Sequence, residues 1–251
     1  MILTSLFLYR ILSGPCPNPI LSTALIYYSF DSSTVSGNTV TNLGSGGSTY
    51  NGQLHGNPIV TSIDKVVGSG AMSFVSSSTQ YVQIPPFTAT SAGVSTAFWF
   101  KFSSSVLSAS RIFDFGNGNS NLDGVGVTVG QIAIMFMCTN TGNCLYFENF
   151  DTNLAVADQI WRHGVWTIDS AGNWLAYING KLTGAYGAVS PVTTVLRNLN
   201  YLGKSNANAD PYLDGWIDEF YYFESVLSAG QVLSLYQRGG TGVVYSTCIH
   251  Q

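Results

Sequence analysis

The sequence predicts an all-β protein in which two antiparallel sheets pack face to face in one domain, followed by a single short helix. Short apolar runs alternate with clusters of Gly, Ser, Asn and Pro along the chain, which is the pattern of many strands joined by turns. The 251 residues are 45% hydrophobic, enough to bury one substantial core. So many strands in one open sheet would leave a large apolar face uncovered, and two stacked sheets are therefore expected.

The expected strands are short apolar or alternating runs bounded by turn-forming residues. They cover residues 24–30, 71–75, 81–84, 95–102, 111–115, 125–129, 132–137, 145–150, 163–168, 174–178, 199–202 and 215–223. Asn179 and Gly180 lie between Tyr177-Ile178 and Lys181-Leu182, and both tolerate the positive φ that a two-residue hairpin turn needs. The helix is expected after Ser228, because Ser228 and Gln231 form a capping box and a Gly-Gly pair at 239–240 ends the helical spacing that follows.

The surface is expected to be polar but almost uncharged. Only 9% of the residues are charged, against about a quarter in an average soluble domain. Such a surface suits a packed array, an extracellular matrix or a virion coat, where neighbours meet without a large cost of charge desolvation. The nine Lys and Arg residues are scattered singly and the net charge is −4, which argues against nucleic acid as the main partner.

Four cysteines indicate two disulfides. Cys138 and Cys144 flank a turn-rich loop between two apolar runs, where a bridge across a hairpin end is geometrically plausible. Cys16 and Cys248 flank the domain, and the ends of a domain often lie close together. The alternative is four reduced thiols, since the spacing is not that of a zinc site. We expect the disulfides, and with them a location outside the cell, on a cell surface or on a virion.

The N-terminal residues are apolar without forming a clear signal peptide. They lack a basic start, contain Arg10 and reach no small-residue cleavage site before Pro15, and the segment is too short to span a bilayer. We expect an N-terminal arm or uncleaved signal-like segment at residues 1–22, a sandwich at 23–240 and a tail at 241–251. The arm is expected to dock on a neighbouring subunit or on the domain's own surface. The chain has no N-x-[ST] acceptor, so ordinary N-glycans are not expected.

Three segments carry a resemblance to a known family. They are an opening strand at 24–31 that ends in Y-x-F-D, a Trp-initiated strand at 161–166 followed by a W-x-x-Y-x-N-G hairpin at 174–180, and a G-x-I-D-E strand within 213–220. In this order, closed by an L-S-x-x-Q-V helix, they resemble the laminin-G-like jelly roll of the concanavalin-A-like lectin and glucanase superfamily over roughly residues 22–240. The resemblance implies a jelly-roll strand order. It supports function only loosely, since the fold hosts lectins, adhesion modules, glucanases and structural domains.

The carboxylates do not form a catalytic pattern. Glycosidases need two carboxylates about 5 to 10 Å apart, and the glucanases of this superfamily carry E-x-D-x-x-E on one strand. The three Glu residues, at 148, 219 and 224, do not fit that pattern. Asp218 and Glu219 are adjacent and should point to opposite faces of a strand. The three histidines, at 55, 163 and 250, show no triad or metal spacing, so the chain is not expected to be an enzyme.

A structural calcium ion is implied by the resemblance. Members of this fold often hold calcium between the first and last strands, and the matching positions here are Asp218, Asp31 and Gly70. Rim sites are also possible, at Asp123 and Asp210, because hard oxygen ligands from loops suit calcium. The alternative is that Asp218 accepts backbone hydrogen bonds and that the loops use Asn and Gly for turn geometry.

Two functions compete for this sequence. A non-catalytic glycan-binding or adhesion module would bind its ligand through the loops at 116–124 and 206–212. The residues expected at that site are Asn119, Asp123, Asn208, Asp210 and Tyr212. The five tryptophans are expected mostly in the core, with a minority exposed to stack on sugars. The alternative is a structural subunit of a shell or filament, which contacts neighbouring protein subunits through the sandwich and the N-terminal arm.

Overall fold

The computed structural model describes residues 20–118, 122–123, 126–129, 133–138, 144–148, 157–187, 192 and 194–239. Most of the expected N-terminal arm and all of the expected tail lie outside these residues, as do Cys16 and Cys248. Within the described part of the chain, no helix is long and apolar enough to cross a membrane.

The first of two large antiparallel sheets, which we call sheet A, has eight strands. Its order is β17-β16-β15-β9-β20-β6-β5, and β1 pairs with the second half of β20. Its strands are β1 (Ile26–Tyr28), β5 (Ile59–Thr61), β6 (Ala71–Phe74), β9 (Gly93–Phe102), β15 (Arg162–Asp169), β16 (Trp174–Ile178), β17 (Lys181–Tyr186) and β20 (Gly215–Phe223).

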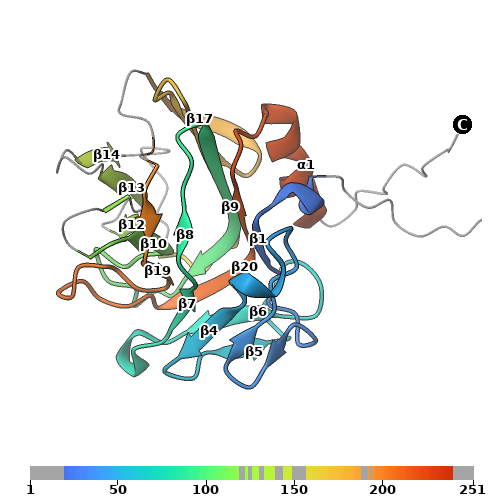
Figure 1. Ribbon diagram of the computed structural model, residues 1–251. Coiled ribbons are helices and arrows are strands. Elements are labelled where there is room, and N and C mark those ends of the chain that lie inside the picture. The colour runs from blue at the N-terminus through green and yellow to red at the C-terminus, as the bar shows by residue number, and fades with distance from the viewer. Residues whose placement is uncertain are drawn as a thin grey trace, which may run out of the picture.

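Sheet B has seven strands in the order β11-β10-β19-β7-β4-β3-β2. They are β2 (Val35–Ser36), β3 (Thr39–Val40), β4 (Gly52–His55), β7 (Tyr81–Ile84), β10 (Phe113–Gly116), β11 (Leu122–Asp123) and β19 (Leu199–Leu202). Two smaller sheets are formed by β8 (Phe87–Thr88) with β18 (Leu196–Arg197), and by β12 (Gly126–Val129), β13 (Ala133–Cys138) and β14 (Cys144–Glu148). The β12–β14 sheet lies on the opposite side of the molecule from the helix (Figure 1). Three short 3-10 helices complete the described elements, η1 (Leu21–Thr23), η2 (Gly47–Tyr50) and η3 (Ser76–Ser78).

The main core lies between the two sheets and is rich in aromatic rings. Phe98 and Phe220 from sheet A pack against Phe113 from sheet B, with ring centroids 5.6 to 5.8 Å from Phe113. Trp166 stacks on Phe98 at 5.1 Å. Alternate residues of β9, β10 and β16 point into this layer, as the period of a half-buried strand requires. The prediction of a two-sheet antiparallel sandwich is confirmed.

A second apolar cluster lies on the outer face of sheet A, where helix α1 (Ala229–Gly239) covers β1, β9 and β15 (Figure 1). The predicted capping box is present: the Ser228 N–H donates to Gln231 Oε1 at 2.8 Å, and the Gln231 N–H donates to Ser228 Oγ at 3.3 Å. Val232 and Leu235 point from the helix into the cluster and are buried. The helix therefore closes one side of the sandwich.

The predicted hairpin turn is also confirmed. Asn179 and Gly180 have φ values of 51° and 77°, the left-handed conformation that a type I′ turn needs at both central positions. The turn joins β16 to β17, and the Asn179 side chain accepts a hydrogen bond from the His163 N–H at 2.9 Å. The turn is thereby fixed to the neighbouring strand β15.

Candidate functional site

The solvent face of sheet B carries a row of mostly polar side chains in register across five strands. Leu54, Val82 and Leu202 point into the core, so the residues that alternate with them in β4, β7 and β19 face outward. The row consists of Thr39, Gln53, Gln83, Tyr201 and Asp114, each the backbone partner of the next. This face therefore presents amide and phenol groups side by side.

Beside this row lies a cluster that we call the tyrosine patch, formed by His55, Tyr81, Tyr201, Lys204 and Tyr212. The His55 ring is stacked on Tyr81 with centroids 4.5 Å apart and an angle of 4°. Tyr201 meets Tyr81 edge to face at 5.5 Å, and Tyr212 lies 6.0 Å from Tyr81. The Lys204 Nζ lies 4.3 Å from the Tyr201 centroid and 4.8 Å from the Tyr81 centroid. Burial raises the pKa values of Tyr81 and Tyr201 and lowers that of Lys204.

The loop between β19 and β20 supports this patch through buried polar contacts. Asn206 donates to both oxygens of Asp114, from its side-chain amide at 2.8 Å and from its backbone N–H at 3.1 Å. Asp210 forms an ion pair with Arg111 at 2.7 Å and accepts a hydrogen bond from Ser205 at 2.8 Å. Burial raises the pKa of Asp114, and the hydrogen bonds from Asn206 oppose that shift. The loop is thus anchored to β10 and holds Tyr212 in position.

The structure brings only one of the residues expected from sequence into the patch. Tyr212 belongs to it, whereas Asp210 is engaged with Arg111. Asn208 is exposed on the same loop, and Asp123 lies in β11, where its backbone pairs with Phe115. Asn119 lies outside the described residues. Sequence reasoning missed His55, Tyr81, Tyr201 and Lys204, although the alternation in Tyr81-Val82-Gln83-Ile84 does indicate that Tyr81 and Gln83 face away from the core.

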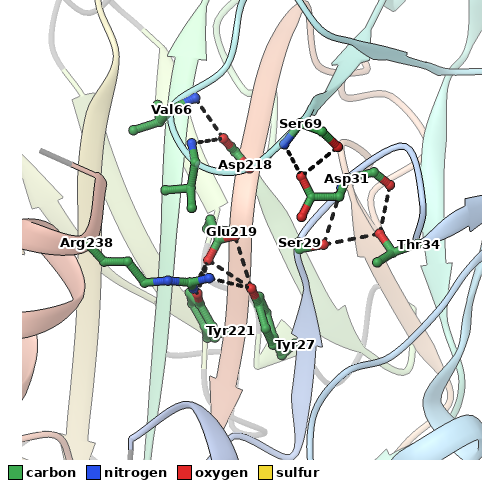
Figure 2. Close-up of polar contacts among 11 residues, drawn as sticks. Tyr27, Ser29, Asp31, Thr34, Val66, Ser69, Asp218, Glu219, Tyr221 and Arg238 are labelled. Atoms are coloured by element: carbon green, nitrogen blue, oxygen red, sulfur yellow. Dashed lines mark hydrogen bonds and ion pairs between the residues drawn. The ribbon is translucent and has the colours of Figure 1, made fainter. Parts of the chain in front are cut away.

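Two of the residues expected to hold calcium, Asp218 and Asp31, lie near each other at the other sheet (Figure 2). Asp218 is fully buried, and its Oδ2 accepts hydrogen bonds from the Val66 and Val67 N–H groups at 2.8 and 3.0 Å. Its Oδ1 is buried and has no hydrogen-bond partner among the described residues. Burial, together with the neighbouring Glu219 and Asp31, raises the pKa of Asp218 to about 7 against the opposing effect of the two N–H groups.

Asp31 and Gly70 complete this neighbourhood. Asp31 Oδ1 accepts hydrogen bonds from the backbone N–H and the hydroxyl of Ser69. A side chain at Gly70 would meet the Phe30 carbonyl oxygen at 2.9 Å, so the glycine permits a close approach to the opening strand. A buried carboxylate oxygen without a hydrogen-bond partner among the described residues fits a hard cation such as calcium. No group of three or more His, Cys, Asp or Glu side chains suited to a metal occurs among the described residues, so backbone carbonyls would have to contribute.

One sequence expectation about Asp218 and Glu219 is wrong: they do not point to opposite faces of β20. Ile217 and Phe220 both face the core, and the register of β20 against β9 shifts between Asp218 and Tyr221. Glu219 has a φ of 53°. This bulge places two consecutive carboxylates on the outer face.

Both carboxylates are buried. Glu219 is 2% exposed and contacts Arg238, Tyr221 and Tyr27 (Figure 2). Burial raises its pKa, and the Arg238 charge opposes the shift. The Glu219 carboxylate is thus held by contacts inside the protein.

The register of β13 against β14 permits the predicted disulfide between Cys138 and Cys144. Cys138 and Cys144 are direct backbone partners at the end of this hairpin. Directly opposed residues of antiparallel strands have Cα atoms about 4.5 to 5.5 Å apart, within the range of a disulfide. The bridge remains a prediction that the backbone permits.

Solved structures with the same fold include carbohydrate- and receptor-binding domains. Domain 4 of an extracellular arabinanase from Geobacillus stearothermophilus, solved in complex with arabinotriose, matches with a TM-score of 0.66 and 19% identity, over 86% of this chain and 98% of that domain. The binding domain of botulinum neurotoxin serotype G matches with a TM-score of 0.63 and 19% identity, over 85% of this chain and 50% of that chain. The binding domain of botulinum neurotoxin DC, in complex with rat synaptotagmin II, matches with a TM-score of 0.63 and 17% identity, over 88% of this chain and 53% of that chain.

This chain therefore spans about half the length of the matched neurotoxin domains. No curated protein matches it. The model of one protein family matches residues 76–233, which is more than half of the chain. This protein belongs to the concanavalin A-like lectin/glucanases superfamily.

Proposed function

We propose that this chain is a non-catalytic glycan-binding module that binds sugar through the tyrosine patch. The proposal rests on the arrangement of the patch. Half-buried aromatic rings lie there on the outer face of sheet B, beside the side-chain amides of Gln53 and Gln83. Amides both donate and accept hydrogen bonds, as sugar hydroxyls require. His55 and Tyr212 are only half-buried, so each offers ring surface to the apolar face of a sugar.

Contacts within the protein hold the patch in one arrangement. His55 stacks on Tyr81, Tyr201 packs edge to face, and the loop that carries Tyr212 is anchored by Asp114 and Arg111. Less side-chain freedom is then lost on binding, which favours affinity. The fold likeness to the arabinanase domain solved with arabinotriose supports a sugar as ligand and an extracellular location for this module.

A glycan array with the full chain tests this proposal. The unmodified protein should bind a defined glycan family, and Tyr81→Ala should abolish that binding. Trp161→Ala, a change of an aromatic residue near sheet A, is the matched control and should leave binding intact. Binding that survives Tyr81→Ala and is lost in Trp161→Ala would move the site to the other sheet and contradict the proposal.

We also propose that calcium binds between Asp218, Asp31 and Gly70 and stabilises the fold rather than contacting the ligand. In support, this neighbourhood lies at sheet A, whereas the tyrosine patch lies on sheet B. Glycan binding should therefore persist when calcium is removed with a chelator, at temperatures where the protein stays folded. Loss of binding in chelator from a folded protein would assign calcium to the ligand site instead.

A second candidate function is assembly between copies of this chain, favoured by the β5 edge of sheet A. Ile59 in this edge strand is 64% exposed and Ile63 just beyond it is 96% exposed. The outward row from Ile59 continues through Ser73 to Trp216 and Lys101. An exposed apolar edge strand can pair with the same strand of a second copy.

Sedimentation of the full chain distinguishes this second function. Assembly through β5 predicts a dimer that Ile59→Lys converts to a monomer, since an edge lysine blocks strand pairing. A monomer at high concentration, or a dimer that Ile59→Lys leaves unchanged, would reject this edge as the contact.

A further inference from the structure

The chemistry that the centre of the tyrosine patch offers to solvent is a positive charge and hydrogen-bond donors rather than free ring faces. The Tyr81 ring is stacked with His55 at 4.5 Å. The Lys204 ammonium lies 4.8 Å from the Tyr81 centroid and 4.3 Å from the Tyr201 centroid, close enough for a cation–π interaction with both rings. A neutral sugar that stacked on these two rings would have to displace Lys204.

The Lys204 charge is not neutralised by a neighbouring carboxylate. Within the described part of the chain, Lys204 forms no ion pair, and burial alone lowers its pKa. Two acidic residues of this region are otherwise engaged: Asp210 pairs with Arg111, and Asp114 is 1% exposed and accepts hydrogen bonds from Asn206. The Lys204 ammonium is therefore available to an anionic group of a ligand.

Three tyrosine side chains meet at the same place. The ring centroids of Tyr201 and Tyr212 lie 5.5 and 6.0 Å from that of Tyr81. Each of these side chains carries a neutral hydroxyl that can donate a hydrogen bond. Gln83, the backbone partner of Tyr201, adds an amide donor. An ammonium with several neutral donors is the donor set that binds a carboxylate.

We propose that the glycan bound by this patch carries a carboxylate, as in a uronic or a sialic acid, and that Lys204 binds this group with the tyrosine hydroxyls. The inference rests on the glycan-binding function proposed above and specifies the class of sugar. The Lys204 ammonium then exchanges part of its contact with the rings for a charge-assisted hydrogen bond, and the rings remain as the floor of the site.

Matched ligand pairs test the proposal with the full chain. One pair is an oligomeric uronan and the same oligomer after reduction of its carboxyl groups, which keeps the sugar stereochemistry. The other pair is a sialylated glycan before and after removal of sialic acid. Calorimetric titration should show at least about tenfold tighter binding of one acidic form than of its neutral partner, because a hydrogen bond to a charged group contributes about this much. Which pair responds identifies the acid.

Three variants separate the role of Lys204 from the fold of the patch. Lys204→Gln should lose the preference for the acidic form and keep the weaker binding of the neutral form, and Lys204→Arg should retain the preference. Lys181→Gln, at an exposed lysine of β17 on the other sheet, should have no effect. Added salt should weaken binding of the acidic form alone.

Three results would overturn the inference and leave glycan binding intact. The first is equal affinity for the acidic and neutral members of both pairs, and the second is an acid preference that Lys204→Gln does not change. The third is a preference confined to sulfated glycans, because the bound group would then not be a carboxylate. Silence of every glycan would instead refute the proposed function itself.

Discussion

Loss of the Arg238 guanidinium should destabilise the protein strongly, because Arg238 is the charge partner of a buried carboxylate. One guanidinium nitrogen contacts Glu219 and Tyr221, and the other donates to the Tyr27 hydroxyl at 3.0 Å. Glu219 is 2% exposed, whereas the Arg238 side chain is 21% exposed. Arg238→Met keeps much of the apolar stem and leaves the Glu219 charge buried without its cation.

The magnitude follows from the burial of this pair. Removal of one partner of a buried ion pair costs about 3–5 kcal/mol. Water can reach the position of Arg238 in part, so we expect the lower end, about 3 kcal/mol. Replacement of both charges by neutral groups relieves the buried charge, so the double variant Arg238→Met with Glu219→Gln should be more stable than the sum of the single variants by about 1–2 kcal/mol.

Urea unfolding of the four proteins in this cycle measures these values. In a thermal scan, about 3 kcal/mol should lower the melting temperature by roughly 6–12 °C for a chain of this size. Lys181→Met, a change at an exposed lysine, is the control and should have almost no effect. A cost below about 1 kcal/mol for Arg238→Met, with additive single variants, would show that solvent screens the pair and refute the reasoning.

Three further experiments test other parts of the structure. Burial lowers the pKa of His163 to about 3, whereas a histidine in the unfolded chain has a pKa of about 6.5. Between these two pH values the unfolded state binds more protons than the folded state. The free energy of unfolding therefore falls as the pH drops below about 6.5. His163→Phe should make this fall shallower by up to about 1.4 kcal/mol per pH unit in denaturant unfolding, and an unchanged slope would contradict the burial. Calcium at a hundred times its dissociation constant should stabilise the protein by about 2.7 kcal/mol. The variant Asp218→Asn keeps an acceptor for the Val66 and Val67 N–H groups but should abolish this gain. Equal calcium responses of the variant and the unmodified protein would exclude the site. Alkylation of the unreduced, denatured protein should find no free thiol, whereas four modified cysteines would remove the argument for an oxidising environment.

The long strands and the helix could be predicted from sequence because their signals are local. Strands β7, β16, β19 and β20 were predicted at their observed bounds, and β9 and β15 were predicted to within two residues. The capping box of Ser228 and Gln231 and the turn at Asn179-Gly180 are local chemistry that neighbours do not override. Strands β2, β3 and β5 were missed because they have two or three residues, too few for an alternating pattern to be recognised.

The bulge at Glu219 could not be predicted from the same local rules. Regular alternation sends Asp218 and Glu219 to opposite faces, and the observed arrangement depends on contacts with Arg238 and Tyr27 from the two ends of the domain. The strained φ of Glu219 persists because these tertiary contacts hold the carboxylate.

The tyrosine patch was mostly beyond sequence reasoning for a related reason. Its members come from β4, β7, β19 and the loop that follows, so their proximity depends on strand order and register. Tyr212 was selected because turn-rich loops often carry binding residues. Lys204 had no distinguishing signal until the register placed it over Tyr81 and Tyr201.

The most direct test of the proposed binding face is nuclear magnetic resonance of the full chain with labelled tyrosine and tryptophan side chains, titrated with the best glycan from the array. If the tyrosine patch binds the glycan, the ring signals of Tyr81, Tyr201 and Tyr212 shift with ligand concentration while those of Trp161 and Trp216 stay unchanged. Shifts confined to the two tryptophans would place the ligand on sheet A and contradict the assignment of the binding face.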